Sequence, residues 1–217
     1  MALGFNFGGG GGSSDDIVPI VKFDCRSGRM FRIDRANGEN HQTDLTRSFK
    51  AVFDFENVET GWIAFTAGTA PSFNVVKYGS PVPAQPSSEH KPGVRLLVKL
   101  GKDCGGDVRE LASTAKAFLR GIDEVHSAYQ AGAIENPGKL PVIELVDTVA
   151  ITSGEGAKKS TNYSPVFKIV SWVARPADFV WRPKAQSAAA APAPVNAPPS
   201  TGSTRVEAPT LSDDDFG

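Results

Sequence analysis

Alternation of apolar and polar residues with a period of two is the pattern that most restricts the fold of this chain. Segment 49–56, FKAVFDFE, carries an apolar side chain at every second position from Phe49 to Phe55. The same period over segment 93–101, GVRLLVKLG, predicts two rows of side chains: Val94, Leu96, Val98 and Leu100 inside, and Arg95, Leu97 and Lys99 outside. Such alternation requires strands that hold one face against a core.

Further strands are predicted on both sides of these two segments. They cover residues 17–25, 29–35, 61–68, 72–79, 140–152 and 164–174, and the first two form a hairpin. One helix interrupts the strands. Asp107 and Glu110 form a capping box, and apolar residues recur at helical spacing from Val108 to Tyr129. The helix is therefore predicted to begin at residue 107 and to end before the Asn-Pro-Gly turn at 136–138.

Few architectures accommodate several strands, one helix and then two more strands. The OB-fold, a five-stranded Greek-key barrel, does so when the helix lies between strands three and four. A β-sandwich with an incidental helix is the alternative. We therefore expect a mainly β, OB-fold-like body over residues 17–184. A flexible Gly/Ser-rich arm over 1–16 precedes it, and a disordered Ala/Pro linker over 185–210 and an acidic tip over 211–217 follow.

Several classes of protein are disfavoured by the sequence. It has no run of about 18 apolar residues, so no membrane span is predicted. The opening segment 1–16 lacks the basic region and the long apolar stretch of a secretion signal. Cys25 and Cys104 lie far apart and outside any metal-ligand spacing, which predicts two free thiols in a reducing cytosol, with a disulfide as the alternative. The expected location is therefore cytoplasmic.

The sequence carries no recognisable catalytic or metal-binding pattern. His41, His90 and His126 are widely separated, and none has an acid or a cysteine nearby at ligand spacing. Segment 101–107, GKDCGGD, is Gly-rich but lacks the G-x-x-x-x-G-K-[ST] spacing of a P-loop. His126 is interpreted as a packing or surface residue of the predicted helix. The sequence thus predicts no enzyme, no cofactor and no metal site.

Cations and aromatic residues are interleaved through the predicted strands, a combination that suits single-stranded nucleic acid. Cations neutralise phosphates, and aromatic rings stack on unpaired bases. The candidate binding residues on the strands are Arg29, Arg32, Arg35, Lys50, Lys77, Arg95 and Lys99, together with Trp62, Phe65, Phe73, Tyr78 and Trp172. Core packing for the aromatic residues and a solvated face for the cations are the alternatives.

The segment between the last two predicted strands adds to this set. It reads SGEGAKKSTNYS over residues 153–164, with Gly154 and Gly156 providing flexibility. Lys158 and Lys159 are adjacent cations, and Tyr163 offers a stacking face. OB-folds carry a major binding loop at this place, so the segment is predicted to contact nucleic acid, with an ordinary polar loop as the alternative.

The chain closes on an acidic tip that ends in an aromatic residue and a glycine, TLSDDDFG. A strand-rich body, an Ala/Pro linker and such a tip resemble the single-stranded DNA-binding proteins of bacteria and phages. Bacterial members end in D-D-D-I-P-F, and the phage T7-like group has an acidic tail that ends in an aromatic residue. The stretches GGDVRELASTAKA and NYSPVFKIVSWV are similar to phage proteins of this role. Gly217 departs from the family, whose tips usually end on the aromatic residue.

The resemblance implies a function for both parts of the chain. The body would bind single-stranded DNA with little sequence preference during phage-type replication and recombination, in the cytoplasm of a bacterial host. The tip would recruit replication or recombination enzymes through Asp213, Asp214, Asp215 and Phe216. A homo-oligomer is compatible with this sequence. The alternative is a phage virion or assembly protein whose acidic tail keeps it soluble.

Overall fold

The computed structural model describes residues 18–36, 39–156 and 159–180. They form ten strands and one α-helix: β1 (Ile20–Asp24), β2 (Arg29–Ala36), β3 (Glu39–Asp44), β4 (Lys50–Phe53), β5 (Glu59–Ala64), β6 (Ser72–Lys77), β7 (Lys91–Leu100), β8 (Val108–Ser113), α1 (Lys116–Ala133), β9 (Lys139–Ser153) and β10 (Ser160–Ala174). The described body is therefore mainly β. Lys158, the arm, the linker and the acidic tip lie outside the described residues.

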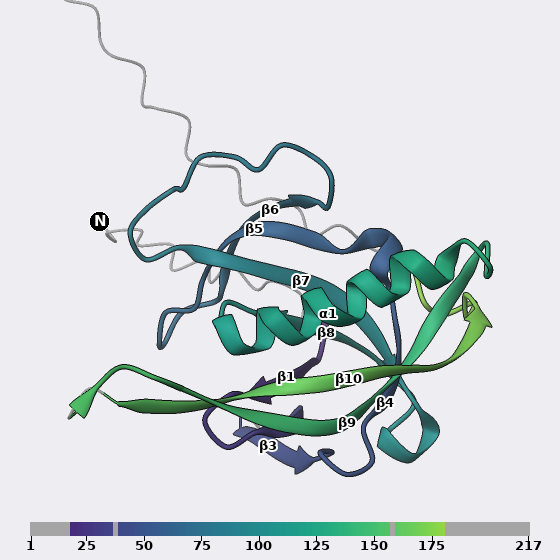
Figure 1. Ribbon diagram of the computed structural model, residues 1–217, viewed down its shortest axis with the longest axis horizontal. Helices are drawn as coiled ribbons and strands as arrows, with labels where there is room; N and C mark the ends of the chain where they lie inside the picture. The colour runs from purple at the N-terminus through teal and green to yellow at the C-terminus, as the bar shows by residue number, and fades with distance from the viewer. Residues whose placement is uncertain (1–17, 37–38, 157–158, 181–217) are drawn as a thin grey trace, which may run out of the picture. The chain divides into compact units, whose positions relative to one another are not determined.

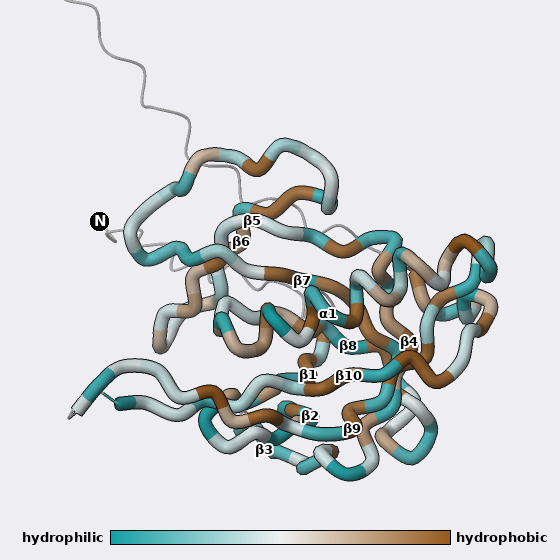
Figure 2. The backbone as a smooth tube through the Cα atoms, in the orientation of Figure 1, coloured by the Kyte–Doolittle hydropathy of each residue, from teal (hydrophilic) through white to brown (hydrophobic). Residues whose placement is uncertain are grey.

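The strands form one mixed sheet in the order β10-β9-β4-β7-β8-β1-β2-β3, with β5 beside β7 and β6 beside β5. Only the pairing of β1 with β8 is parallel among the described strands. β7 lies at the centre, where it pairs with β8 along one edge and with β5 and then β4 along the other. Its run of apolar residues suits a strand that is covered on both faces, and Figure 2 shows this hydrophobic stretch.

The expectation of five strands with the helix after the third is not met. The described residues contain ten strands, and the helix follows the eighth. The hairpin predicted for 17–25 and 29–35 is confirmed, because β1 and β2 pair antiparallel. β3 was not predicted, because all six of its residues are exposed and its sequence, ENHQTD, is polar throughout.

The sheet curls until β10 meets the turn that follows β1. The Tyr163 amide donates a hydrogen bond of 2.7 Å to the Cys25 carbonyl oxygen. Two bulges bend the long β9–β10 hairpin, one at Val146 and one at Val170. In Figure 1 this hairpin runs below α1, and β5 and β7 run above it.

α1 packs closely on β10. The Ser164 hydroxyl donates a hydrogen bond of 2.8 Å to the Ala117 carbonyl oxygen. Gly121 faces Pro165, and any Cβ at position 121 would collide with the Pro165 carbonyl oxygen. Glycine is therefore required at the crossing of the helix and the strand.

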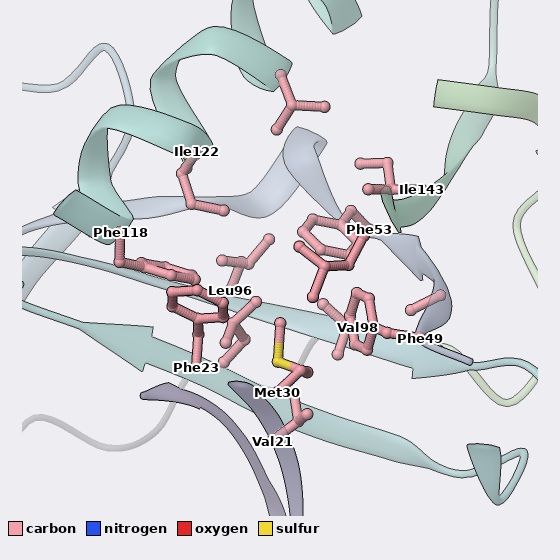
Figure 3. Packing of buried hydrophobic residues seen from close by; sticks show 14 of the residues in the cluster. Val21, Phe23, Met30, Phe49, Phe53, Leu96, Val98, Phe118, Ile122 and Ile143 are labelled. Atoms are coloured by element: carbon pink, nitrogen blue, oxygen red, sulfur yellow. The ribbon is translucent and has the colours of Figure 1, made fainter. Parts of the chain in front are cut away.

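The main core lies between α1 and the curled sheet. Phe118 of α1 faces Phe23 of β1, with 6.0 Å between the ring centroids, and Figure 3 shows this contact above Met30. The inner row predicted on β7 is confirmed: Val94, Leu96, Val98 and Leu100 are all buried. The predicted apolar row of segment 49–56 is also buried: Phe49, Ala51, Phe53 and Phe55. The period of two thus identified the core correctly.

The helix begins later than its apolar spacing predicts. Residues 108–113 form β8, which lies between β7 and β1 and pairs with both, and α1 begins only at Lys116. Asp107 precedes β8 and therefore cannot cap the helix, whose N-cap is Ala115; its carboxylate forms an ion pair of 2.7 Å with Arg109. Pairing with two neighbouring strands decides the conformation here over local helical spacing.

A second cluster lies on the other face of β7 and is called the outer cluster. It contains Leu97, Leu140 and Phe179, with Val18, Val52 and Val108 packed against it. The chain folds back after β10 to insert Phe179 there, and the preceding Asp178 forms an ion pair with Lys99. Val18 and Phe179 therefore meet the same surface of the sheet.

Both cysteines, Cys25 and Cys104, are free, as predicted, and both are buried. Within the described residues, no helix has the length and the apolar character needed to cross a membrane.

Candidate nucleic-acid interface

A groove of about 650 Å³ lies between α1 and the strands β5 and β7. We call it the α1 groove. Its sheet side is formed mainly by Thr60, Gly61 and Trp62 of β5 and by Pro92, Gly93 and Val94 of β7. Its helix side is formed by Lys116, Leu119, Arg120, Ile122, Asp123 and His126, with Tyr78 and Val82 also lining it. Figure 1 shows α1 running beside these strands.

Two glycines allow the backbones on the sheet side of the groove to lie close to one another. Gly61 and Gly93 are paired across β5 and β7. A Cβ at Gly61 would lie 2.5 Å from the Asn74 carbonyl oxygen, and one at Gly93 would lie 2.9 Å from the Ser113 carbonyl oxygen. Both contacts are shorter than a side chain tolerates, so this wall is built from closely packed backbone.

Aromatic rings line the groove. The Trp62 indole donates a hydrogen bond of 2.8 Å to the Pro83 carbonyl oxygen, which fixes the orientation of the half-buried ring. Tyr78 is 51% exposed, and its ring centroid lies 4.8 Å from that of His126. His126 also contacts Phe55 at 5.1 Å. Tyr78 therefore offers an accessible ring that is supported from behind by a packed aromatic group.

Burial makes His126 an uncharged part of this wall. It lowers the pKa of His126 below the ordinary value of 6.5, and the nearby Asp123 opposes this effect only partly. The imidazole is therefore neutral at neutral pH.

Two cations lie on the helix side. Lys116 and Arg120 are four residues apart, which places them on the same face of α1. Lys116 is exposed and has no ion pair among the described residues, while Arg120 forms an exposed pair of 3.0 Å with Glu124. Water screens such an exposed pair strongly, so both side chains can attract phosphate.

The α1 groove is lined both by residues that the sequence predicted to bind nucleic acid and by residues that it did not. Trp62 and Tyr78 were predicted from the sequence, and Lys77 precedes Tyr78 as an exposed residue at the end of β6. Lys116 and Arg120 were not predicted. Their spacing of four on the polar side of an amphipathic helix was the signal that could have indicated them.

Arg95 was predicted on an outward face, and this prediction is wrong. Its side chain is buried, with ion pairs of 3.0 Å to Glu59 and 2.9 Å to Glu110. Its guanidinium also lies 4.9 Å from the centroid of the Phe73 ring. Burial raises the pKa of Glu59, although Arg95 favours its ionised form. Arg95 thus belongs to a buried network of charges rather than to an exposed phosphate path, and the half-buried Phe73 is its neighbour.

The remaining predicted cations on strands are mostly paired. Arg29 pairs with Asp44, Arg32 with Asp34, Lys50 with Glu144, and Lys99 with Asp178. Arg35 is exposed near the end of β2. None of these five residues lines the α1 groove, and their contact with DNA stays a prediction.

The other predicted aromatic residues, two in β10 and one just after β5, pack against neighbouring side chains or turns. Trp172 stacks on Tyr129 of α1, with 5.7 Å between the ring centroids. Tyr163 packs against the β1–β2 turn, where a Cβ at Gly28 would lie 3.0 Å from its ring. Phe65 is exposed and contacts Phe73 edge-on. Lys159 is exposed just before β10.

Comparisons with protein-family models, with curated proteins and with solved structures find no match. The α1 groove is therefore the main basis for a functional argument.

Proposed function

We propose that the folded body binds single-stranded DNA with little sequence preference, and that the α1 groove holds the strand. The observation that carries the proposal is that accessible aromatic rings and cations line one groove. Bases would stack on Tyr78 and the exposed part of Trp62, and phosphates would lie along Lys116 and Arg120. The role is binding, without catalysis.

The chemistry of the groove favours an unpaired strand over a duplex. Base faces are hidden inside a duplex, so stacking on Tyr78 requires bases that are free of their partners. Such stacking contributes about 1–3 kcal/mol per base, and phosphate contacts release counterions and make binding sensitive to salt. Apolar residues such as Val82 and Leu119 add a surface for bases rather than for phosphates.

We also make a proposal about the type of β-fold. We infer an OB-type barrel that is enlarged by additional strands. The curling of the sheet through the Tyr163–Cys25 hydrogen bond and the position of α1 before the last hairpin support this inference.

The acidic tip gives the chain a second proposed role, which rests on its resemblance to phage and bacterial single-stranded DNA-binding proteins. Asp213, Asp214, Asp215 and Phe216 would recruit replication or recombination enzymes in the cytoplasm of a bacterial host. When DNA is absent, the tethered tip would compete for cationic surface of the body.

The proposal is tested by fluorescence anisotropy with labelled oligo-dT and with a duplex of equal length over a salt series. The full-length protein should bind oligo-dT more tightly than duplex, and affinity should fall steeply as salt rises. A Lys116→Ala, Arg120→Ala variant should weaken binding and lower the salt slope. A matched variant, Lys22→Ala with Lys168→Ala, removes two exposed strand cations outside the groove.

Three outcomes would contradict the proposal. Equal affinity for duplex would remove the stacking argument, and equal effects of the two double variants would remove the groove from the binding path. Absence of salt-sensitive binding to oligo-dT would favour a virion or assembly role.

A further inference from the structure

We propose that the α1 groove discriminates between bases and prefers guanine to thymine, through the carboxylate of Asp123. This inference rests on the proposed binding of single strands and adds a modest selectivity to it. It starts from the order of charged residues along the helix side of the groove.

The charges of the groove are arranged from one end to the other. Lys116 and Arg120 lie in the first half of α1, and Asp123 and His126 follow them toward its middle. The pKa of His126 is lowered by burial, so the imidazole adds no positive charge at its end at neutral pH. The groove therefore has a cationic end and an end with one carboxylate.

This order orients a bound nucleotide. Phosphate is attracted to Lys116 and Arg120 and is repelled by the carboxylate of Asp123. The base then extends toward Asp123, where Tyr78 and His126 provide the aromatic surface.

Asp123 has an unused hydrogen-bonding capacity. It is exposed, it lines the groove, and its carboxylate makes no hydrogen bond or ion pair with any described residue. An ionised carboxylate only accepts hydrogen bonds. It therefore favours a base edge that presents donors and disfavours one that presents carbonyl oxygens.

Guanine matches this requirement best among the four bases. Its Watson–Crick edge presents the N1–H and an N2–H side by side, and both oxygens of one carboxylate can accept them at once. Thymine presents one N3–H between two carbonyl oxygens, which repel the carboxylate. Cytosine and adenine present an amino group beside a ring acceptor and should rank between them. Base edges of this kind are accessible in single strands.

The experiment compares short labelled oligo-dT with the same strand carrying guanine or hypoxanthine at central positions. Hypoxanthine keeps the N1–H and lacks the N2 amino group. The wild-type protein should bind the guanine strand about tenfold more tightly than oligo-dT, with the hypoxanthine strand between them. In Asp123→Ala the ratio of the guanine and thymine affinities should fall close to one.

The ratio is the readout, because removing any negative charge near a phosphate path strengthens binding of every strand. Glu135→Ala is the matched control, since it removes one exposed carboxylate just beyond α1 and outside the groove. It should keep the wild-type ratio.

A wild-type ratio close to one, or a ratio that survives in Asp123→Ala, overturns the inference. If both strands bind equally and Tyr78→Ala weakens both, only the inference fails. If neither strand binds, the proposed function fails with it.

Discussion

Arg175 holds the fully buried Asp54 in a bidentate ion pair, with nitrogen–oxygen distances of 2.7 and 2.9 Å. The same guanidinium also donates hydrogen bonds of 3.2 Å to the Phe179 carbonyl oxygen and of 2.8 Å to the Glu56 carboxylate. Hydrogen bonding to Asp54 raises the pKa of Arg175. The pair thereby fastens the segment after β10 to the end of β4.

Arg175→Ala should lower the free energy of unfolding by about 3 kcal/mol, because it leaves the buried carboxylate of Asp54 without its cation. Urea denaturation followed by circular dichroism measures the change. Arg120→Ala serves as the comparison, since its pair with Glu124 is exposed and contributes little. An equal loss of unfolding free energy in the two variants would show that the Arg175–Asp54 ion pair is not an important stabilising contact.

Tyr78 and Trp172 should respond oppositely to substitution by alanine. Tyr78→Ala should weaken binding of oligo-dT by about 1–3 kcal/mol with a nearly unchanged Tm, because its ring is accessible in the groove. Trp172→Ala should lower the Tm and leave binding almost unchanged, because its ring packs on Tyr129. Thermal melting and anisotropy on the same samples provide the check, and the reverse pattern would assign the stacking role to β10.

His126 should make stability depend on pH in the mildly acidic range. Burial lowers its pKa in the folded state below 6.5, so folding favours the neutral imidazole. Its contribution is fully present above pH 6.5 and is lost as pH falls through the folded-state pKa. The free energy of unfolding should therefore decrease in this window, and His126→Gln should reduce the decrease. An identical pH dependence in the variant would exclude His126 as the cause.

Removal of residues 211–217 should tighten binding of single-stranded DNA at low salt and abolish recruitment of a partner enzyme. The first effect follows from losing tethered carboxylates that compete for cationic surface, and salt should weaken it. Phe216→Ala should separate the effects, because it keeps the charge and removes the aromatic anchor. Unchanged affinity at low salt together with retained partners in a pull-down would leave the tip a solubilising role.

Strands in which apolar and polar residues alternate were predictable, because this alternation directly reflects which side chains are buried. β4 and β7 carry apolar residues at every second position, and the inner row from Val94 to Leu100 is buried as predicted. β8 was missed because Val108 and Leu111 also fit helical spacing. Its conformation is set by β7 and β1, which pair with it from distant parts of the chain.

The candidate site was only partly predictable for a related reason. Aromatic residues on strands pointed to Trp62 and Tyr78, but the sequence did not show that α1 would lie beside β5 and supply Lys116 and Arg120. Arg95 was misassigned because strand alternation gives the side of a sheet and not what covers it. Glu59 and Glu110 come from neighbouring strands, and only the pairing of β5, β7 and β8 brings them to Arg95.

Val18 and Phe179 pack in the same outer cluster, although they lie near opposite ends of the described chain. The body can therefore be rearranged as a circular permutant, with a short linker from residue 180 to residue 18. New ends fit the exposed segment 65–71 between β5 and β6. Such a permutant would keep every described strand pairing while moving the points where the flanking segments attach from the outer cluster to the segment between β5 and β6.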